Sequence, residues 1–183
     1  MSEQKSHTRF LPLTVFALIA LVFIILMWRQ SSGDYDPSAL PSALRGKPVP
    51  AYTLPSLDGE QLTEASLPGT AYLLNVWATW CISCKAEHPY LNQLHKSGIP
   101  IVGLNYKDDV AKARIWLERL GDPYQQHIVD VDGTLALDLG VSGAPETFVV
   151  DQSGRIRLRI EGPLNERRWR KEVIPLGIEW GIQ

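Results

Sequence analysis

The chain has 183 residues, which is enough for one folded domain together with a tail or an anchor. Hydrophobic residues make up 45% of it and charged residues 21%, an ordinary balance for a globular protein. The net charge of −2 gives no sign of the basic face that nucleic-acid binding requires, so we exclude nucleic acid as a partner.

An uncharged run lies near the N-terminus. Residues 10–28, which begin with Phe10 and end with Trp28, read FLPLTVFALIALVFIILMW. This run approaches the ~20 apolar residues that span a bilayer as a helix. The alternative is a cleaved signal peptide, but residues 24–29 offer no small-residue cleavage site. We therefore expect one N-terminal transmembrane helix that stays uncleaved, with Trp28 at the membrane interface.

The charges around this run predict its orientation. Lys5 and Arg9 precede it, so the positive-inside tendency places residues 1–9 in the cytoplasm. Residues 29–45 are rich in Ser, Pro, Gly and Asp and are expected to form a linker. Residues 46–183 then form a folded domain in the periplasm, held at the inner membrane by a single pass, in a compartment where disulfides persist.

Hydrophobic periodicity and turn residues predict the elements of the folded domain. In chain order we expect a hairpin from 50–57 and 60–62 around Asp58-Gly59, a strand at 71–77, a helix over 85–96 that opens near residue 81, a strand at 99–106, a helix at 110–120 capped by Asp108 or Asp109, a strand at 128–131, a helical turn at 134–139, strands at 146–150 and 155–160, and a helix at 165–173. This order predicts an α/β fold, with a mixed sheet and helices on both of its faces.

The two cysteines of the chain lie at the junction of a predicted strand and helix. Residues 75–91 read NVWATWCISCKAEHPYL, so Cys81 falls at the helix N-terminus and Cys84 one turn further on. Free N–H groups and the positive end of the helix dipole favour a thiolate there, and the thiolate is the attacking species in disulfide exchange. The spacing lets the two sulfurs lie side by side and form a reversible disulfide.

Three other interpretations of the cysteine pair are open. It could be half of a zinc site with His88, although a structural zinc site takes four protein ligands and no second cysteine pair exists. It could be a purely structural disulfide, although so short a loop removes little chain entropy. It could also be two inert buried thiols. We expect no metal, and assign no role to His88, His95 or His127.

Two strings support a more specific hypothesis. The stretches WATWCISCKAEHPYL and GVSGAPETFVVD resemble the membrane-anchored thiol:disulfide interchange proteins of the DsbE/CcmG type, and GKPVPAYTLPSLDG fits the same family. The resemblance implies a thioredoxin-like fold and a protein-disulfide reductase without a bound cofactor. It also implies a role in cytochrome c maturation: keeping the haem-attachment cysteines of apocytochrome c, or of a maturation protein that carries its disulfide, reduced. A transmembrane thiol carrier would be the electron donor.

The resemblance and the cysteine chemistry together assign roles. Cys81 is expected to be the exposed nucleophile, and Cys84, deeper in the helix, to resolve the mixed disulfide. Trp80, at the turn, is expected to contact partners, whereas Trp77 could line the same surface or belong to the core. The Ala144-Pro145 bond is expected to be cis and to present a backbone edge to an extended substrate; an ordinary trans turn is the alternative.

Two carboxylates are candidates for tuning the thiols. If Glu87 and Glu146 approach the cysteines, their charge disfavours the thiolate and makes the dithiol a better electron donor, while Lys85 acts in the opposite direction. Either carboxylate could instead be solvated.

Two other functions remain open on the same fold. One is a general thiol oxidant or isomerase, and the other is a Cu(I) or haem carrier that uses Cys81, Cys84 and His88.

Overall fold

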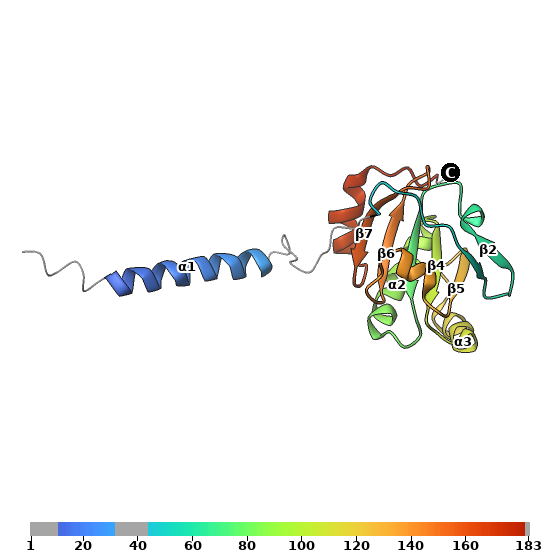
Figure 1. Cartoon of the computed structure of the whole chain (residues 1–183), viewed down its shortest axis with the longest axis horizontal. Coiled ribbons are helices and arrows are strands. Elements are labelled where there is room, and N and C mark those ends of the chain that lie inside the picture. Colours follow the sequence, from blue (N-terminus) through green and yellow to red (C-terminus); the bar gives the residue numbers. More distant parts are fainter. Residues whose placement is uncertain (1–10, 32–43, 182–183) are drawn as a thin grey trace, which may run out of the picture. The chain divides into compact units, whose positions relative to one another are not determined.

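A computed structural model of the chain describes residues 11–31 and 44–181 (Figure 1). The chain divides into two units, residues 1–41 and 42–183, which are described separately below. The predicted cytoplasmic segment 1–9 lies outside the described residues, as does most of the predicted linker.

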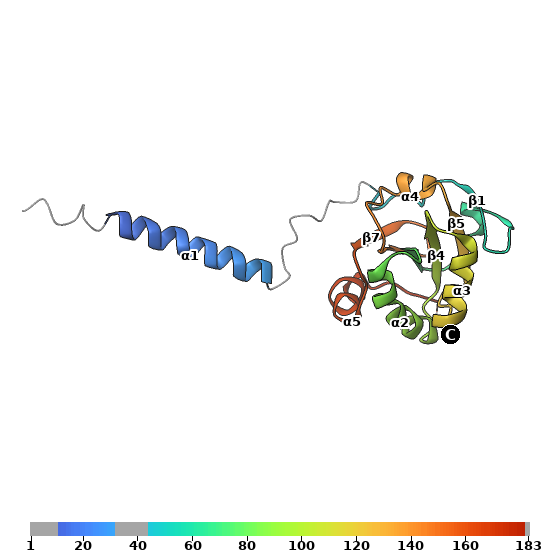
Figure 2. The same cartoon turned by 90° about the horizontal axis from the view of Figure 1, so that it is seen from below.

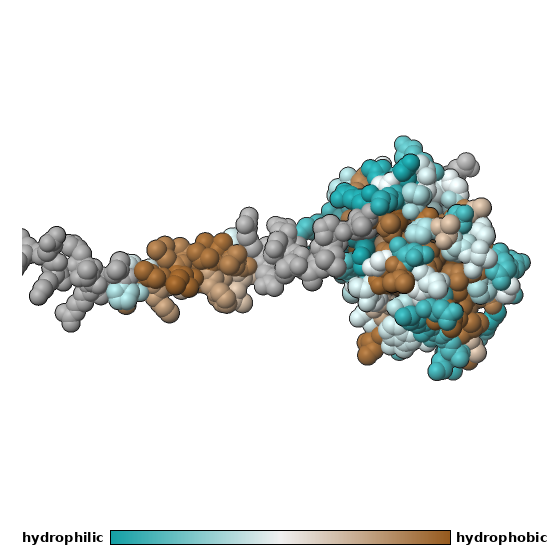
Figure 3. Space-filling model, viewed as in Figure 1, coloured by the Kyte–Doolittle hydropathy of each residue, from teal (hydrophilic) through white to brown (hydrophobic). Residues whose placement is uncertain are grey.

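The described part of the first unit is one helix, α1 (Leu11–Ser31). It covers nearly all of the predicted anchor, and hydrophobic side chains dominate its visible surface (Figure 3). Among the described residues, however, no helix is both long enough and apolar enough to cross a membrane.

A five-stranded sheet forms the centre of the second unit. Its strands are β3 (Tyr72–Trp77), β4 (Ile101–Tyr106), β5 (Gln126–Asp130), β6 (Glu146–Val150) and β7 (Ile156–Glu161). They lie in the order β5-β4-β3-β6-β7, with the β3, β4 and β5 pairs parallel and the β3–β6 and β6–β7 pairs antiparallel. The predicted mixed sheet is therefore confirmed, and its central strand β3 leads directly into the cysteine turn.

A small hairpin precedes the sheet. β1 (Thr53–Pro55) and β2 (Gln61–Thr63) pair antiparallel around the predicted Asp58-Gly59 turn, and a 3₁₀ turn, η2 (Glu64–Ser66), follows. Gly59 has φ = 86°, which a residue without a Cβ adopts at no steric cost. The predicted hairpin is confirmed, with shorter strands.

Helices cover both faces of the sheet, as the sequence predicts (Figure 2). They are α2 (Ile82–Lys96) and α3 (Val110–Leu120) on one face and α4 (Thr134–Asp138) on the other. Asp109 caps α3 by accepting the Lys112 N–H at 2.9 Å, and Gly121, with φ = 89°, ends it. Both ends of α3 agree with the predicted capping.

The C-terminal helix begins where the sequence predicts but is irregular. Asn165 caps a short α5 (Glu166–Arg168), but the chain then widens into a π-helical turn, η3 (Trp169–Val173), and tightens into a 3₁₀ turn, η4 (Ile174–Leu176). Pro175 lies in η4 and has no N–H with which to continue an α-helical ladder. The helix predicted at 165–173 is therefore confirmed as helical, with a change from α to π geometry after its first turn.

The alternation of side chains along β3 divides the core into two halves. Leu73 and Trp77 pack toward α2, α3 and the C-terminal turns. Tyr72, Leu74 and Val76 pack on the other face, toward α4 and the hairpin. Because both faces of β3 are covered, its run of buried residues is continuous, as expected for a central strand.

Candidate active site

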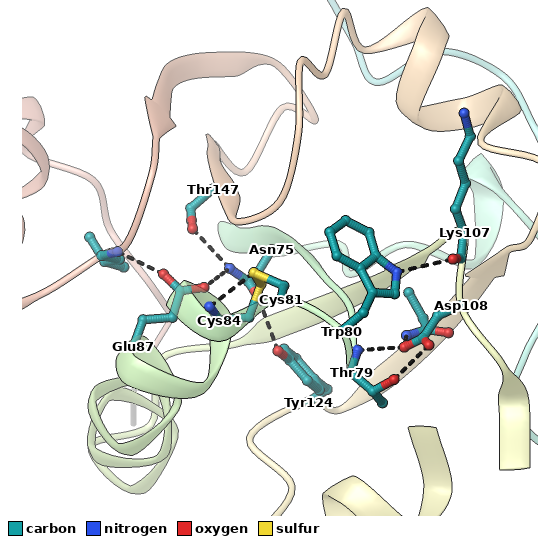
Figure 4. The surroundings of a disulfide bond; sticks show 12 residues. Asn75, Thr79, Trp80, Cys81, Cys84, Glu87, Lys107, Asp108, Tyr124 and Thr147 are labelled. Atoms are coloured by element: carbon teal, nitrogen blue, oxygen red, sulfur yellow. Dashed lines mark hydrogen bonds between the residues drawn. A yellow bond between two sulfur atoms is a disulfide. The ribbon is translucent and has the colours of Figure 1, made fainter. Parts of the chain in front are cut away.

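Cys81 and Cys84 form a disulfide at the start of α2, with their Cα atoms 5.3 Å apart (Figure 4). Cys81 is the N-cap of the helix: its backbone is extended, and its Sγ accepts the Cys84 N–H at 3.0 Å. The predicted position of the first sulfur at a helix N-terminus is confirmed. In the reduced protein, the same N–H group and the helix dipole stabilise a Cys81 thiolate.

The exposure of the two cysteines only partly matches the prediction. Cys81 is 6% exposed and Cys84 is 2% exposed, so Cys84 does lie deeper. The expectation of an exposed Cys81 is nevertheless wrong, because its side chain packs into the core cluster against which Ala144 also packs. Trp80 and Ile82, on either side of Cys81 in the sequence, are 54% and 87% exposed, so the cysteine turn lies at the surface.

The two tryptophans before the cysteines have different environments. Trp77 is fully buried and stacks between Trp116 and Tyr124, with ring centroids 4.9 and 5.4 Å away. The core alternative for Trp77 is thus confirmed. Trp80 is exposed, and its indole N–H donates to the carbonyl of Lys107 at 3.1 Å, which fixes the ring beside the disulfide (Figure 4).

A carboxylate that the sequence did not single out holds the turn before Cys81. Asp108 accepts the Thr79 backbone N–H at 2.6 Å and the Thr79 hydroxyl at 2.7 Å, and Asn105 donates to it at 3.0 Å. Sequence analysis gave Asp108 only a possible helix-capping role. Its contact with Thr79 joins residues 29 positions apart, which no local pattern indicates.

The loop before β6 lies beside the core cluster that contains Cys81. The Ala144–Pro145 bond is cis, as the resemblance implied, and Ala144 packs against that cluster. Glu146 fixes the loop from inside, because its Oε1 accepts the backbone N–H groups of Ser142 and Gly143 at 2.8 and 3.2 Å.

Glu146 is buried and paired, not solvated. It is 1% exposed, and the Arg159 guanidinium donates to both of its oxygens, at 2.7 and 3.0 Å. This bidentate ion pair joins β6, which carries Glu146, to β7, which carries Arg159. The structure gives Glu146 a clear role in holding the Pro145 loop, while the tuning role stays a prediction.

Glu87 is also buried, at 2% exposure, so the solvated alternative is wrong for it too. Its Oε1 accepts from the Asn75 amide at 2.9 Å, and its Oε2 accepts the Leu164 N–H at 2.7 Å. Burial raises the pKa of Glu87 to about 7; the two hydrogen bonds and the positive charge of Arg168 hold it below what burial alone would give. Glu87 therefore titrates near neutral pH, one helical turn from Cys84.

Glu87 belongs to a buried polar cluster at the inner side of the disulfide (Figure 4). Asn75 donates to Glu87 and, at 3.0 Å, to the Thr147 hydroxyl, and it accepts the Tyr124 hydroxyl at 2.9 Å. Sequence analysis missed Asn75, Thr147 and Tyr124. One signal was present, because Asn75 is a polar residue inside the apolar run AYLLNVW.

His88 has a structural environment. Its Nε2–H donates to the Gly121 carbonyl at 2.7 Å, its ring packs edge-on against Trp116, and burial lowers its pKa. Within residues 11–31 and 44–181, no group of three or more His, Cys, Asp or Glu side chains could hold a metal ion.

Comparison with known proteins agrees with this geometry. The Redoxin family model matches residues 44–173. The thiol:disulfide interchange protein DsbE of Yersinia pestis is 52% identical over 181 residues, covering 96% of each chain. The DsbE of Escherichia coli K12 is 51% identical over 175 residues, covering 94% of each chain.

A solved structure supports the fold. The crystal structure of a thiol:disulfide interchange protein of the thioredoxin family from Chlorobium tepidum superimposes with a TM-score of 0.58 at 26% identity. The match covers 75% of this chain and 97% of that one. The thioredoxin-like α/β fold that the sequence predicts is confirmed.

Glu87 predicts a specific dependence of stability on pH. Because its pKa rises from 4.5 when unfolded to about 7 when folded, the native state holds a proton that the unfolded state releases. This contribution is fully present below about pH 4.5 and is lost as the pH rises to about 7, a change on the order of 3 kcal/mol. We expect Glu87→Gln to remove it, as measured by urea unfolding between pH 4.5 and 8.

The exposed Glu118→Gln variant is the matched control, and it should keep the wild-type pH dependence. A Glu87→Gln curve parallel to that of the wild type would contradict the assignment of this titration to Glu87.

Proposed function

Because this chain belongs to the Redoxin family and, within it, to the DsbE-type thiol:disulfide interchange proteins, we propose that it is a reductant for disulfides of client proteins outside the cytoplasm. Thiol–disulfide exchange itself follows from the family and the Cys81–Cys84 pair. The observation that carries the proposal is the Cys81 sulfur at the N-terminus of α2, where it accepts the Cys84 N–H.

The exchange has two steps. The Cys81 thiolate attacks one sulfur of the client disulfide, a mixed disulfide forms, and the other client sulfur leaves as a thiolate. Cys84 then attacks the Cys81 sulfur, the Cys81–Cys84 bond forms, and the second client sulfur leaves. Two electrons pass to the client, and the cysteine pair is oxidised.

Glu87 accepts the proton of Cys84 in the second step. The two side chains lie three positions apart on α2, hence on one helical face, and both are buried from bulk water. A carboxyl whose pKa is about 7 is suited to exchange a proton at physiological pH.

The same carboxyl supports the direction of electron flow. Once ionised, Glu87 disfavours a thiolate on the neighbouring cysteines. The reduced form is then less stable relative to the disulfide, which makes the pair a donor of electrons and opposes a role as a strong oxidant.

The proposed clients are apocytochrome c or a cytochrome c maturation protein that carries its disulfide, with electrons supplied by a transmembrane thiol carrier. Similarity to DsbE proteins and the GAPETF motif support this part, which rests on analogy. Trp80 and Ile82, both exposed beside Cys81, are the proposed contacts to the client.

The proposed location is the periplasmic side of the inner membrane, with residues 10–28 as a single-pass anchor. The uncharged run and the exposed apolar side chains of α1, among them Phe16 and Phe23, support it.

Trapping tests the roles of the two cysteines. Cys84→Ala removes the resolving thiol, so mixed disulfides with clients should accumulate and appear as adducts on non-reducing gels. Cys81→Ala removes the attacking sulfur and should give no adducts and no reductase activity. Mass spectrometry of the adducts names the clients; absence of any adduct with Cys84→Ala would refute the assignment.

The redox potential tests the direction. Equilibration of the purified chain with glutathione buffers should give a potential nearer that of thioredoxin, about −270 mV, than that of a strong oxidant, about −120 mV. The fraction of reduced cysteines is measured by alkylation and mass shift. A value at the oxidising end would favour the alternative of a general oxidant or isomerase.

Fractionation tests the location. The full-length chain, expressed in a bacterium, should stay in the membrane fraction after alkaline carbonate washing, and protease added to spheroplasts should degrade residues 46–183. A variant without residues 10–28 should lose membrane retention. Recovery of the full-length chain in the soluble fraction would exclude the anchor.

A further inference from the structure

Three residues in register on neighbouring strands of the sheet lie next to Glu87. Asn75 in the central strand β3 pairs in register with Gly103 of β4 on one side and with Thr147 of β6 on the other. A Cβ on Gly103 would lie 2.9 Å from the Tyr124 ring, so the missing side chain is what lets this ring lie against β4. From that position, the Tyr124 hydroxyl reaches the Asn75 amide oxygen at 2.9 Å.

The hydrogen bonds of Asn75 select one orientation of its amide. The oxygen accepts from Tyr124, while the NH₂ group donates to Glu87 at 2.9 Å and to Thr147 at 3.0 Å. Rotating the amide by 180° would turn its oxygen toward the Glu87 carboxylate. It would also leave the buried Tyr124 hydroxyl without an acceptor for its proton, which is costly in the interior.

Tyr124 keeps that proton throughout the physiological range. Burial, together with the negative charges of Glu87 and Asp122, raises its pKa well above the usual 10. The phenol is therefore a permanent donor. Thr147 differs from it, because its hydroxyl can donate to or accept from the amide in either orientation.

We propose that Tyr124 is a positioning residue for the disulfide exchange: by fixing the Asn75 amide, it keeps an N–H donor on Glu87 and so keeps this carboxylate available to accept the Cys84 proton. The inference rests on the proposed function of Glu87. The chemistry is unchanged: the Cys84 proton passes to Glu87, the Cys84 sulfur bonds to Cys81, and the client sulfur leaves with its electron pair.

Other groups that face Glu87 also affect its pKa, independently of Tyr124. Arg168 of α5 favours its ionised form by charge, and the Leu164 N–H donates to its second oxygen. The Cys84 thiol lies on the same helix. None of these contacts passes through Asn75, so they persist when Tyr124 is changed.

Removing the phenol hydroxyl should raise the pKa of Glu87. In Tyr124→Phe the amide is free to turn its oxygen toward Glu87, an arrangement that favours the protonated carboxyl. Losing one buried hydrogen bond to a charged group corresponds to a shift of about one pH unit upward.

The two steps can be followed separately with 5,5′-dithiobis(2-nitrobenzoate). Attack by Cys81 on this disulfide releases one thionitrobenzoate, and resolution by Cys84 releases the second. Stopped-flow absorbance of the reduced full-length chain, between pH 5 and 9, gives a pH midpoint for the second phase. In Tyr124→Phe we expect this midpoint to move up by about one unit, so that the second phase is roughly tenfold slower at acidic pH, while the first phase is unchanged.

Three further variants test the route of the effect. Asn75→Ala should raise the midpoint, and adding Tyr124→Phe to it should raise it no further, because both act through the same amide. Tyr72→Phe is the matched control: Tyr72 is a buried tyrosine on the opposite face of β3, and its hydroxyl has no hydrogen-bond partner within the described residues. Its midpoint should equal that of the wild type.

The outcomes separate this inference from the proposed function. Two phases in the wild type with an unmoved midpoint in Tyr124→Phe would overturn the inference alone, as would additive shifts in the double variant. No release of thionitrobenzoate by the wild type would overturn the proposed function. Thermal melts at pH 7 confirm that each variant is folded before its kinetics are measured.

Discussion

The hydrogen bond that the Cys84 N–H, in the first turn of α2, donates to the Cys81 sulfur is the interaction on which the site depends. A helix leaves its first N–H groups without partners, and here the sulfur of the N-cap residue accepts one of them. One residue thereby starts the helix and carries the reactive atom. The buried strand β3 and the Thr79–Asp108 contact fix where this helix begins, so the position of the sulfur follows from the core.

Behind the sulfur, the protein buries a cluster of polar side chains that includes Asn75, Glu87 and Thr147. Burying a carboxyl is costly unless it is hydrogen-bonded, and Glu87 meets this requirement with partners from β3 and from Leu164. These hydrogen bonds offset only part of the effect of burial, which raises the pKa of Glu87 to about 7. Packing thus gives Glu87, one helical turn from Cys84, a pKa near neutrality that a solvated glutamate would not have.

The second buried carboxylate, Glu146, has a different role from Glu87, although the sequence suggested both as carboxylates that tune the thiols. Glu146 forms an ion pair with the Arg159 guanidinium, and its Oε1 also accepts a backbone N–H of the loop before Pro145. Both carboxylates were candidates for tuning the thiols, and their different hydrogen-bond partners give them different roles. Glu87 has no guanidinium within hydrogen-bond distance, whereas Glu146 is held in a bidentate ion pair and fixes the backbone of the loop before Pro145.

The sequence by itself determined the strand–cysteine–helix unit, the hairpin, the succession of strands and helices along the chain and the N-terminal position of Cys81, because each follows from local periodicity or turn chemistry. Only the tertiary structure decided the burial of Cys81, the partners of Glu87 and Glu146, and the roles of Asn75 and Tyr124. Asn75 and Tyr124 are 49 positions apart and meet because β4 pairs with β3 on one side and with β5 on the other, and Tyr124 lies just before β5. Hydrogen bonds across such separations leave no periodic trace along the chain, so they become visible only when the strands are placed side by side.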